Sequence, residues 1–208
     1  MESPLCPDGL RLIETMLWDG AAFPRRAGHM ARLAASAAAL GFAHDPAAIA
    51  RALAAATTPG TPSRIRLTLG SAGDAEAAAA PLPPARPEWR VAVSEVRLNS
   101  ADTLLRHKTT RRDAYDRARG ALPADTDEAL LLNERGEVCE GTITTLFFDL
   151  GKGLMTPPLS CGCLAGVLRT ELLADGTCRE GSLRAADLPR ARLWVGNALR
   201  GLIPARLA

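Results

Sequence analysis

The segment from Glu140 to Arg169 holds the side chains whose types and order could do chemistry. It opens with a carboxylate, Glu140, and closes with Gly166-Val167-Leu168-Arg169, where a glycine precedes a predicted helix. The first turn of a helix offers unpaired backbone N–H groups that suit a phosphate. Upstream stands Lys108, and a lysine amine can form an imine with a carbonyl compound. Together these groups are what a phosphorylated, cationic, imine-forming cofactor needs.

Lys108 is one of two lysines in the chain, and its surroundings are unusual. The other, Lys152, lies between two glycines, as expected of a solvated surface lysine. Arg106 precedes Lys108 and Arg111 and Arg112 follow it, and such a cluster of cations lowers the pKa of an amine and favours the neutral nucleophile. A basic helix start in solvent is the alternative, although positive charge there opposes the helix dipole.

The other candidate residues also have ordinary structural explanations when each is taken alone. Glu140 fits a glutamate at the edge of a strand, and Gly166 fits a simple turn before a helix. The pair Cys161 and Cys163 could suggest a thiol or metal site, but no histidine lies nearby in the sequence. Two small buried residues explain that pair better, so we expect no metal. The order and spacing of the signals, rather than any single residue, make the pattern specific.

Composition limits the class of protein. The 208 residues are 47% hydrophobic and 23% charged, which is ordinary for a soluble globular protein. The formal net charge of +2 is too small to indicate binding to nucleic acid or to an acidic membrane surface. The 5 cysteines show no Cys-x-x-Cys spacing, the N-terminus has no signal-like pattern, and no apolar run could span a bilayer. We therefore expect a cytoplasmic protein.

Hydrophobic spacing predicts mixed α/β structure in a small first lobe. Strands are expected over residues 10–18 and 63–69, and helices over 30–40 and 46–56. Residues 70–87 are rich in Gly, Ala and Pro without any hydrophobic period, which predicts a linker. We place the lobe boundary within it, so that residues 1–80 form the small N-terminal α/β lobe and residues 81–208 a larger C-terminal lobe.

Strands and helices also alternate in the second lobe, which is expected to carry Lys108 and the Gly166 helix. The fold class predicted for the whole chain is therefore mixed α/β with two lobes. The expected helices of the second lobe are 109–119 and 167–173, and its expected strands are 89–96, 129–132, 138–139, 143–148, 154–156 and 192–195.

The chain resembles the class IV aminotransferases, the fold type IV pyridoxal-phosphate (PLP) enzymes. This family includes branched-chain and D-amino-acid aminotransferases and aminodeoxychorismate lyase. One departure is Thr145, where the family usually has Asn. The resemblance extends over nearly the whole chain and rests on Leu12-Ile13-Glu14-Thr15, His29-Met30-Ala31-Arg32-Leu33, the Lys108 segment, Glu140–Arg169 and Gly196-Asn197-Ala198-Leu199.

The resemblance implies a two-lobed fold like that of the D-amino-acid aminotransferases, and it implies catalytic roles for two residues. Lys108 would be the Schiff-base lysine and later the proton shuttle. Glu140 would pair with the pyridine nitrogen of the cofactor and keep it protonated, so that the ring can act as an electron sink.

The resemblance also implies contacts with the rest of the cofactor. Arg32 would clamp the phosphate, and the backbone N–H groups of Val167 and Leu168 would complete the phosphate cup. Asn197 matches a position where the family places a polar phosphate ligand. Tyr115 would face the phenolic oxygen of the cofactor, with core packing as an equal alternative.

Two reactions remain open within the family. We prefer the lyase that converts 4-amino-4-deoxychorismate to 4-aminobenzoate and pyruvate in the folate pathway, because the chain is short and its Lys108-Thr109-Thr110-Arg111-Arg112 segment with Tyr115 is similar to compact lyase-like members. The alternative is an aminotransferase for branched-chain or D-amino acids with a 2-keto acid acceptor. A cofactor-free scaffold of the same fold is disfavoured by the intact Lys108 and Glu140.

The resemblance implies a homodimer and a small substrate with amine and carboxylate groups. Arg64, Arg66 and Arg106 are the candidate carboxylate partners.

Overall fold

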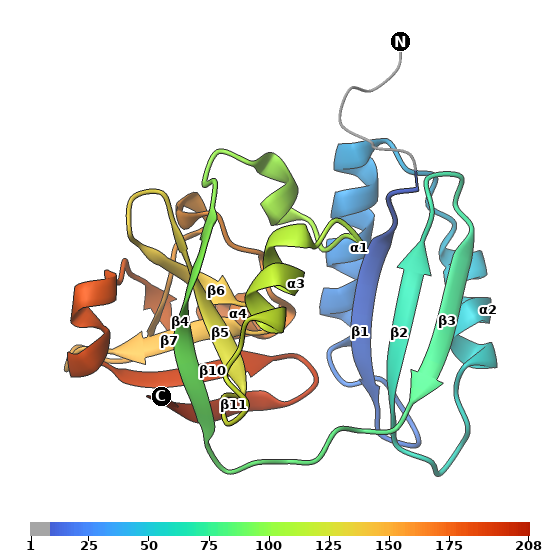
Figure 1. The fold of residues 1–208 in the computed structure, drawn as a ribbon. Coiled ribbons are helices and arrows are strands. Elements are labelled where there is room, and N and C mark those ends of the chain that lie inside the picture. The colour runs from blue at the N-terminus through green and yellow to red at the C-terminus, as the bar shows by residue number, and fades with distance from the viewer. Residues whose placement is uncertain (1–8) are drawn as a thin grey trace. The chain divides into compact units, whose positions relative to one another are not determined.

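The computed structural model describes residues 9–208, which form two compact units. Unit 1 runs to Pro84 and also contains His107–Arg111, whereas unit 2 contains Ala85–Arg106 and Arg112–Ala208. Both units combine strands with helices, as expected (Figure 1). Residues 1–8 of the predicted first lobe, and Cys6 with them, lie outside the described part of the chain. Within that part, no helix is long and apolar enough to cross a membrane.

Unit 1 is an antiparallel sheet in the order β1-β2-β3 with two helices, α1 and α2, packed against its strands (Figure 1). In β2, Ile65 and Leu67 are buried while Arg64 and Arg66 are exposed, because successive side chains point to opposite faces. The glycine at the C-cap of α1 has φ 72°, a conformation that ends a helix at little cost. The elements are β1 (Leu12–Trp18), α1 (Arg26–Leu40), α2 (Pro46–Ala55), β2 (Ser63–Leu69) and β3 (Ala75–Ala80).

The predicted linker over residues 70–87 is wrong in part, because it contains β3. This strand pairs along its whole length with β2, from Arg64 opposite Ala80 to Leu69 opposite Ala75. Alanines carry no hydrophobic period, but an edge strand is held by its backbone hydrogen bonds and needs few large side chains. The chain leaves unit 1 after Pro84 rather than after residue 80.

The segment that carries Lys108 also differs from expectation, because it belongs to unit 1. Ile13 N donates to Lys108 O (2.7 Å), and Thr110 N donates to Arg11 O (2.9 Å). These two bonds place residues 107–111 as an extended edge beside β1, with Leu12 opposite Thr109. An extended segment cannot be helical, so the helix expected from residue 109 begins only at Asp113.

Unit 2 is built on an eight-stranded sheet in the order β6-β5-β4-β11-β10-β7-β8-β9. Strand β4 runs parallel to both β5 and β11, and most other pairs are antiparallel. Strand β11 follows β10 in a hairpin that the sequence analysis did not anticipate. The strands are β4 (Trp89–Leu98), β5 (Glu128–Asn133), β6 (Val138–Gly141), β7 (Thr145–Asp149), β8 (Met155–Thr156), β9 (Arg179–Glu180), β10 (Arg192–Asn197) and β11 (Gly201–Leu207).

Helices and short 3₁₀ turns pack against this sheet around a buried apolar core. The core includes Phe147, Phe148, Leu130 and Leu131, all fully buried. Helix α3, which carries Tyr115, packs on β4 and β5, and α4, which begins with Val167 and Leu168, packs on β10 and β9. The helical elements are η1 (Thr103–Arg106), α3 (Asp113–Gly120), η2 (Leu159–Cys161), α4 (Val167–Ala174) and η3 (Ala185–Arg190).

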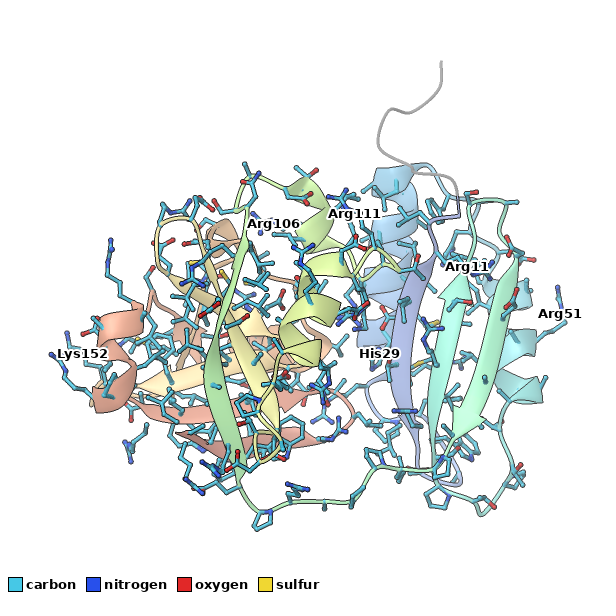
Figure 2. The ribbon with its side chains drawn as sticks, viewed as in Figure 1. Arg11, His29, Arg51, Arg106, Arg111 and Lys152 are labelled. Atoms are coloured by element: carbon cyan, nitrogen blue, oxygen red, sulfur yellow. The ribbon has the colours of Figure 1, made fainter. Side chains whose placement is uncertain are left out.

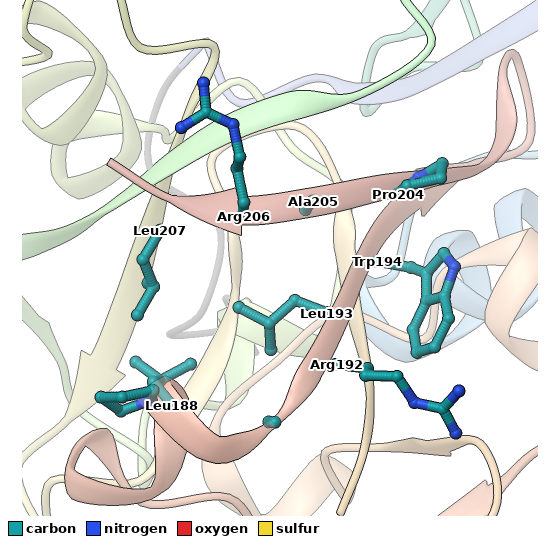
Figure 3. A pocket seen from close by; sticks show the side chains of 10 residues that line it. Leu188, Arg192, Leu193, Trp194, Pro204, Ala205, Arg206 and Leu207 are labelled. Carbon is teal, nitrogen blue, oxygen red and sulfur yellow. The ribbon is translucent and has the colours of Figure 1, made fainter.

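A surface hollow of about 480 Å³ lies along the β10–β11 hairpin and η3 (Figure 3). Leu188, Leu193 and Leu207 point into it, and Arg192 and Arg206 stand at its borders. None of the predicted site residues lines this hollow, so it takes no part in the candidate site.

Candidate active site

Glu140 lies on β6 and is buried, with 5% of its surface exposed. The Tyr115 hydroxyl donates to Glu140 Oε1 (2.7 Å), and Leu164 N donates to both carboxylate oxygens at 3.3 Å. A buried carboxylate is costly unless hydrogen bonds or charges compensate it, and these donors do so here. The arrangement presents a fixed anion, which suits a protonated ring nitrogen.

A second buried carboxylate, Glu128, shapes the loop that follows Glu140. Its oxygens accept from Thr142 N (3.0 Å), Ile143 N (3.1 Å) and the Thr144 hydroxyl (2.8 Å), and also from the Thr142 hydroxyl. A Cβ on Gly141 would lie 2.8 Å from the Glu128 side chain and 2.3 Å from Thr144 Oγ1. The residue directly after Glu140 must therefore be glycine for the loop to close on Glu128.

Glu128 was not among the predicted site residues, although its position in the sequence indicates a buried charge. Asp127 and Glu128 stand immediately before a run of apolar residues, and a charge at the start of a fully buried strand requires a partner.

We expect Glu128→Gln to lower the free energy of unfolding by about 3 kcal/mol, because a neutral amide accepts weakly from several donors that the carboxylate now satisfies. Chemical denaturation followed by circular dichroism measures this change. Glu95→Gln, at an exposed position of β4, is the matched control and should change stability by less than about 0.5 kcal/mol. Equal stability of the two variants would contradict the proposed support of the loop by Glu128.

The predicted phosphate cup lies at the start of α4. Gly166 is the N-cap, and the first intrahelical bond runs from Thr170 N to Gly166 O (2.8 Å), which leaves the N–H groups of Val167 and Leu168 in the unpaired first turn. A Cβ on Gly196 would lie 2.9 Å from the Leu168 side chain. This glycine lets β10 approach the first turn of the helix closely.

Thr145, which replaces the usual asparagine of the resembled family, also lies at this helix start. Its hydroxyl oxygen would be 2.6 Å from a Cβ on Gly166, so the two residues are in close contact. This departure from the family therefore lies beside the predicted phosphate cup, whereas the Glu140 donors described above are Tyr115 and Leu164.

Asn197, the predicted polar phosphate ligand, is held by the turn between β10 and β11. Its Oδ1 accepts from Leu199 N (3.1 Å) and Arg200 N (3.0 Å), and its Nδ2 donates to Ile143 O (3.1 Å). These bonds fix the carboxamide and tie the turn to the loop that Glu128 organises. A phosphate contact by Asn197 remains a prediction.

Arg169, at the far end of the Glu140–Arg169 segment, is buried and binds the protein itself. Its Nη2 donates to Pro157 O (3.0 Å) and forms an ion pair with Glu180 Oε1 (2.5 Å). It thereby holds α4 against the loop before it and against β9. The nearby thiols of Cys161 and Cys163 are buried, and burial raises their pKa values to about 11 and about 12, so both stay protonated at neutral pH.

In unit 1, Arg32 is positioned by a buried carboxylate on β1. Glu14 is 1% exposed and accepts from Arg32 Nε (2.8 Å), Arg32 Nη2 (2.5 Å) and His29 Nδ1 (2.6 Å). Burial opposes ionisation of Glu14, but the charge of Arg32 and the hydrogen bonds from His29 and Arg32 hold its pKa below the usual value. The guanidinium is thus oriented by the protein. Figure 2 shows His29 on α1.

Lys108 shares one face of the unit 1 sheet with two exposed arginines. Because Leu12 is opposite Thr109, Lys108 is opposite Ile13 and projects to the same face as it. Thr15, the next residue of β1 on that face, pairs with Arg66. On the opposite face, His107 contacts Ser36 of α1 (3.0 Å), and burial lowers the His107 pKa. Lys152, by contrast, is exposed and extends away from the ribbon (Figure 2).

Sequence comparisons identify relatives of the chain. The profile of the amino-transferase class IV family matches residues 11–208. Aminodeoxychorismate lyase of Saccharomyces cerevisiae is 35% identical over 52% of this chain, and the match spans only 33% of that longer relative. A Schizosaccharomyces pombe protein provisionally named aminodeoxychorismate lyase is 30% identical over 81% of this chain and 75% of its own length.

A solved structure shares the fold. The crystal structure from Mesorhizobium loti that is provisionally named an amino-acid aminotransferase is 50% identical, with a TM-score of 0.92 over 96% of this chain and 100% of the other. This agreement confirms the predicted mixed α/β fold. The chain therefore belongs to the class IV aminotransferase family of PLP-dependent enzymes.

Proposed function

We propose that this protein is a lyase that converts 4-amino-4-deoxychorismate to 4-aminobenzoate and pyruvate, a step of the folate pathway. The observation that carries the proposal is the agreement of both curated relatives, at 35% and 30% identity, on the name aminodeoxychorismate lyase. The second candidate is an aminotransferase that acts on branched-chain or D-amino acids, which the name of the 50% identical Mesorhizobium loti structure favours.

The residues present fit PLP in their charge and in their hydrogen-bonding groups. Glu140, a buried carboxylate with two donors, is the partner we assign to the protonated ring nitrogen. The unpaired first turn of α4 supplies the N–H groups of Val167 and Leu168 for the phosphate, and Arg32, oriented by Glu14, supplies a cation for it. Lys108 is the residue we assign to the covalent attachment of the cofactor.

When bound, PLP supplies a sink for the electron pair that remains on the substrate carbon after proton loss. In our proposal Lys108 Nζ takes that proton, and a general base held within reach typically contributes a rate factor of about 10²–10⁴. Glu140 keeps the proton on the ring nitrogen, because its carboxylate stabilises the cationic ring. We also propose that the loop after Glu140, which is hydrogen-bonded to Glu128, holds Glu140 in position.

Substrate recognition requires cations, because 4-amino-4-deoxychorismate carries two carboxylates. Of the three candidate arginines, Arg106 donates to Cys163 O (3.4 Å). Arg64 and Arg66 are exposed on the face that carries Lys108, and neither has an ion-pair partner among residues 9–208. This placement supports Arg64 and Arg66 as the carboxylate-binding residues.

We expect Arg66→Gln to raise KM about tenfold or more and to change kcat little, because a lost carboxylate contact weakens ground-state and transition-state binding alike. Steady-state kinetics of 4-aminobenzoate formation measure both constants. Arg51→Gln, at an exposed site of α2 (Figure 2), is the control and should leave KM unchanged. A KM for Arg66→Gln equal to that of the control would exclude Arg66 from substrate binding.

The reaction itself is tested with the purified PLP-loaded protein, 4-amino-4-deoxychorismate and no keto acid. We expect continuous formation of 4-aminobenzoate and pyruvate in equal amounts. A requirement for a keto acid acceptor, together with bleaching of the bound cofactor by an amino acid, would instead identify an aminotransferase and refute the lyase.

We further propose that the protein is a cytoplasmic homodimer. The family resemblance supports the dimer, and the free thiols of Cys139, Cys161, Cys163 and Cys178 fit a reducing compartment. Light scattering should give twice the chain mass of 21.9 kDa, and a monomer mass would contradict this assembly.

A further inference from the structure

We propose that Tyr115 acts on the reaction through Glu140, as the residue that positions this carboxylate and favours its ionised form. From the sequence, we expected Tyr115 either to face the phenolic oxygen of the cofactor or to pack in the core. The inference rests on the proposed role of Glu140 at the ring nitrogen, and it adds a residue that acts on that nitrogen through one hydrogen bond.

The geometry directs the Tyr115 hydroxyl at Glu140. The oxygen–oxygen distance of 2.7 Å is typical of an O–H donor with a carboxylate acceptor. Leu164 N donates to both carboxylate oxygens at 3.3 Å, so the tyrosine hydroxyl and a backbone N–H both hold the group.

Helix α3 and its first residues hold the Tyr115 ring in place. The ring packs against the buried cluster that contains Leu98, Ala129, Leu131 and Cys163. The Arg112 guanidinium lies 4.8 Å from the ring centroid, and its Nη2 donates to Thr142 O (2.6 Å). Arg112 thus links the tyrosine to the same loop that Glu128 organises. The hydroxyl has no freedom to swing away from Glu140 without disturbing this packing.

Because Tyr115 stays protonated, its hydroxyl is always the donor in the hydrogen bond with Glu140. Burial, followed by the charge and the hydrogen bond of Glu140, raises the pKa of Tyr115 far above its usual value. The hydroxyl therefore stays protonated at all ordinary pH values and always donates. Donation to the carboxylate favours its charged form over the carboxylic acid. An ionised Glu140 in turn keeps the proton on the ring nitrogen.

Removal of the Tyr115 hydroxyl should therefore slow the reaction without weakening substrate binding. In Tyr115→Phe, Glu140 loses a donor and competes more strongly for the proton of the ring nitrogen. We expect kcat to fall about tenfold to a hundredfold with KM within about twofold of wild type, since a hydrogen bond to a charged group is involved. In the holoenzyme loaded with ¹⁵N-labelled PLP, the ring-nitrogen NMR signal should move toward that of a neutral pyridine.

The matched control is Leu122→Ala, which removes packing from the same cluster and leaves the hydroxyl in place. It should lower stability while leaving the ¹⁵N signal unchanged. An unchanged ¹⁵N signal in Tyr115→Phe, or an equal shift in Leu122→Ala, would overturn the proposal. A change in the pH dependence of the cofactor's visible absorbance without a ¹⁵N shift would overturn it too, because that result assigns Tyr115 to the phenolic oxygen.

A second measurement needs neither activity nor cofactor. Tyr115 is the only tyrosine of the 208 residues, so the near-ultraviolet absorbance of tyrosinate reports on it alone. In the cofactor-free full chain, we expect no tyrosinate until the protein unfolds in alkali. Glu140→Gln should form tyrosinate at lower pH, because the neighbouring negative charge is gone. Identical curves would refute the contact. A wild-type protein that makes no 4-aminobenzoate would refute the lyase and leave this result standing.

Discussion

Lys108→Ala is expected to abolish turnover, with kcat at least about 10⁴-fold below wild type, because in our proposal this one side chain supplies both the covalent attachment and the general base. The fold should survive, since the contact of this residue with β1 is made by its backbone, from Ile13 N to Lys108 O. The assay is 4-aminobenzoate formation by the PLP-loaded variant, together with its circular dichroism spectrum.

Lys152→Ala is the control for this experiment, because Lys152 is the only other lysine of the chain and lies in an exposed turn. It should retain full activity. A Lys108→Ala protein with turnover within an order of magnitude of wild type would remove Lys108 from its assigned role.

Glu140→Gln is expected to retain PLP but to lose about 10²–10³-fold in kcat, because an amide cannot stabilise a protonated ring nitrogen as a carboxylate does. Gln has nearly the same shape as Glu, so the Tyr115 and Leu164 donors keep an oxygen to bind, and the phosphate contacts that we propose for α4 are untouched. The measurements are the dissociation constant of PLP from its visible absorbance and kcat for 4-aminobenzoate formation.

Glu95→Gln serves again as the control, since it changes the same charge on an exposed part of the same unit. Near-normal turnover of Glu140→Gln would contradict the ring-nitrogen assignment. Loss of PLP binding from Glu140→Gln alone would show instead that the carboxylate is needed mainly to hold the cofactor.

Segments with a regular hydrophobic period were predictable from the sequence, because the spacing of their apolar side chains alone determines whether a helix or a strand forms. Helix α1 follows from apolar residues at helical spacing and from Gly41, which adopts the positive φ that ends it. Strand β2 follows from the alternation of arginines with buried aliphatic residues. In both cases the side chains alone indicate which face is buried.

Elements that depend on a neighbour were not predictable in the same way. Strand β3 consists mostly of alanines and exists because β2 offers it a backbone partner. Residues 107–111 pair with β1, which lies almost a hundred positions earlier in the chain, and this pairing delays the start of α3 to Asp113. Neither pairing leaves a trace in the local pattern of hydrophobic residues.

The residues of the candidate site also divide into those that the sequence indicates and those that depend on a distant partner. Lys108, Glu140 and the glycine before α4 could be named from their types and order. The supporting carboxylates Glu14 and Glu128 could not be named in this way. Glu14 is paired with Arg32 and His29, and Glu128 is paired with residues of the loop after Glu140. Such contacts join residues that only the tertiary fold brings together. The same holds for the hydrogen bond from Tyr115 to Glu140.

We propose above all that Lys108 attaches the PLP cofactor. Borohydride reduction of the PLP-loaded protein, followed by proteolysis and mass spectrometry of the peptides, tests it most directly, because the chain has only two lysines that could be labelled. We predict loss of the visible absorbance and a phosphopyridoxyl group on the peptide that contains Lys108. A group on the Lys152 peptide, or no modified peptide at all, would contradict the account.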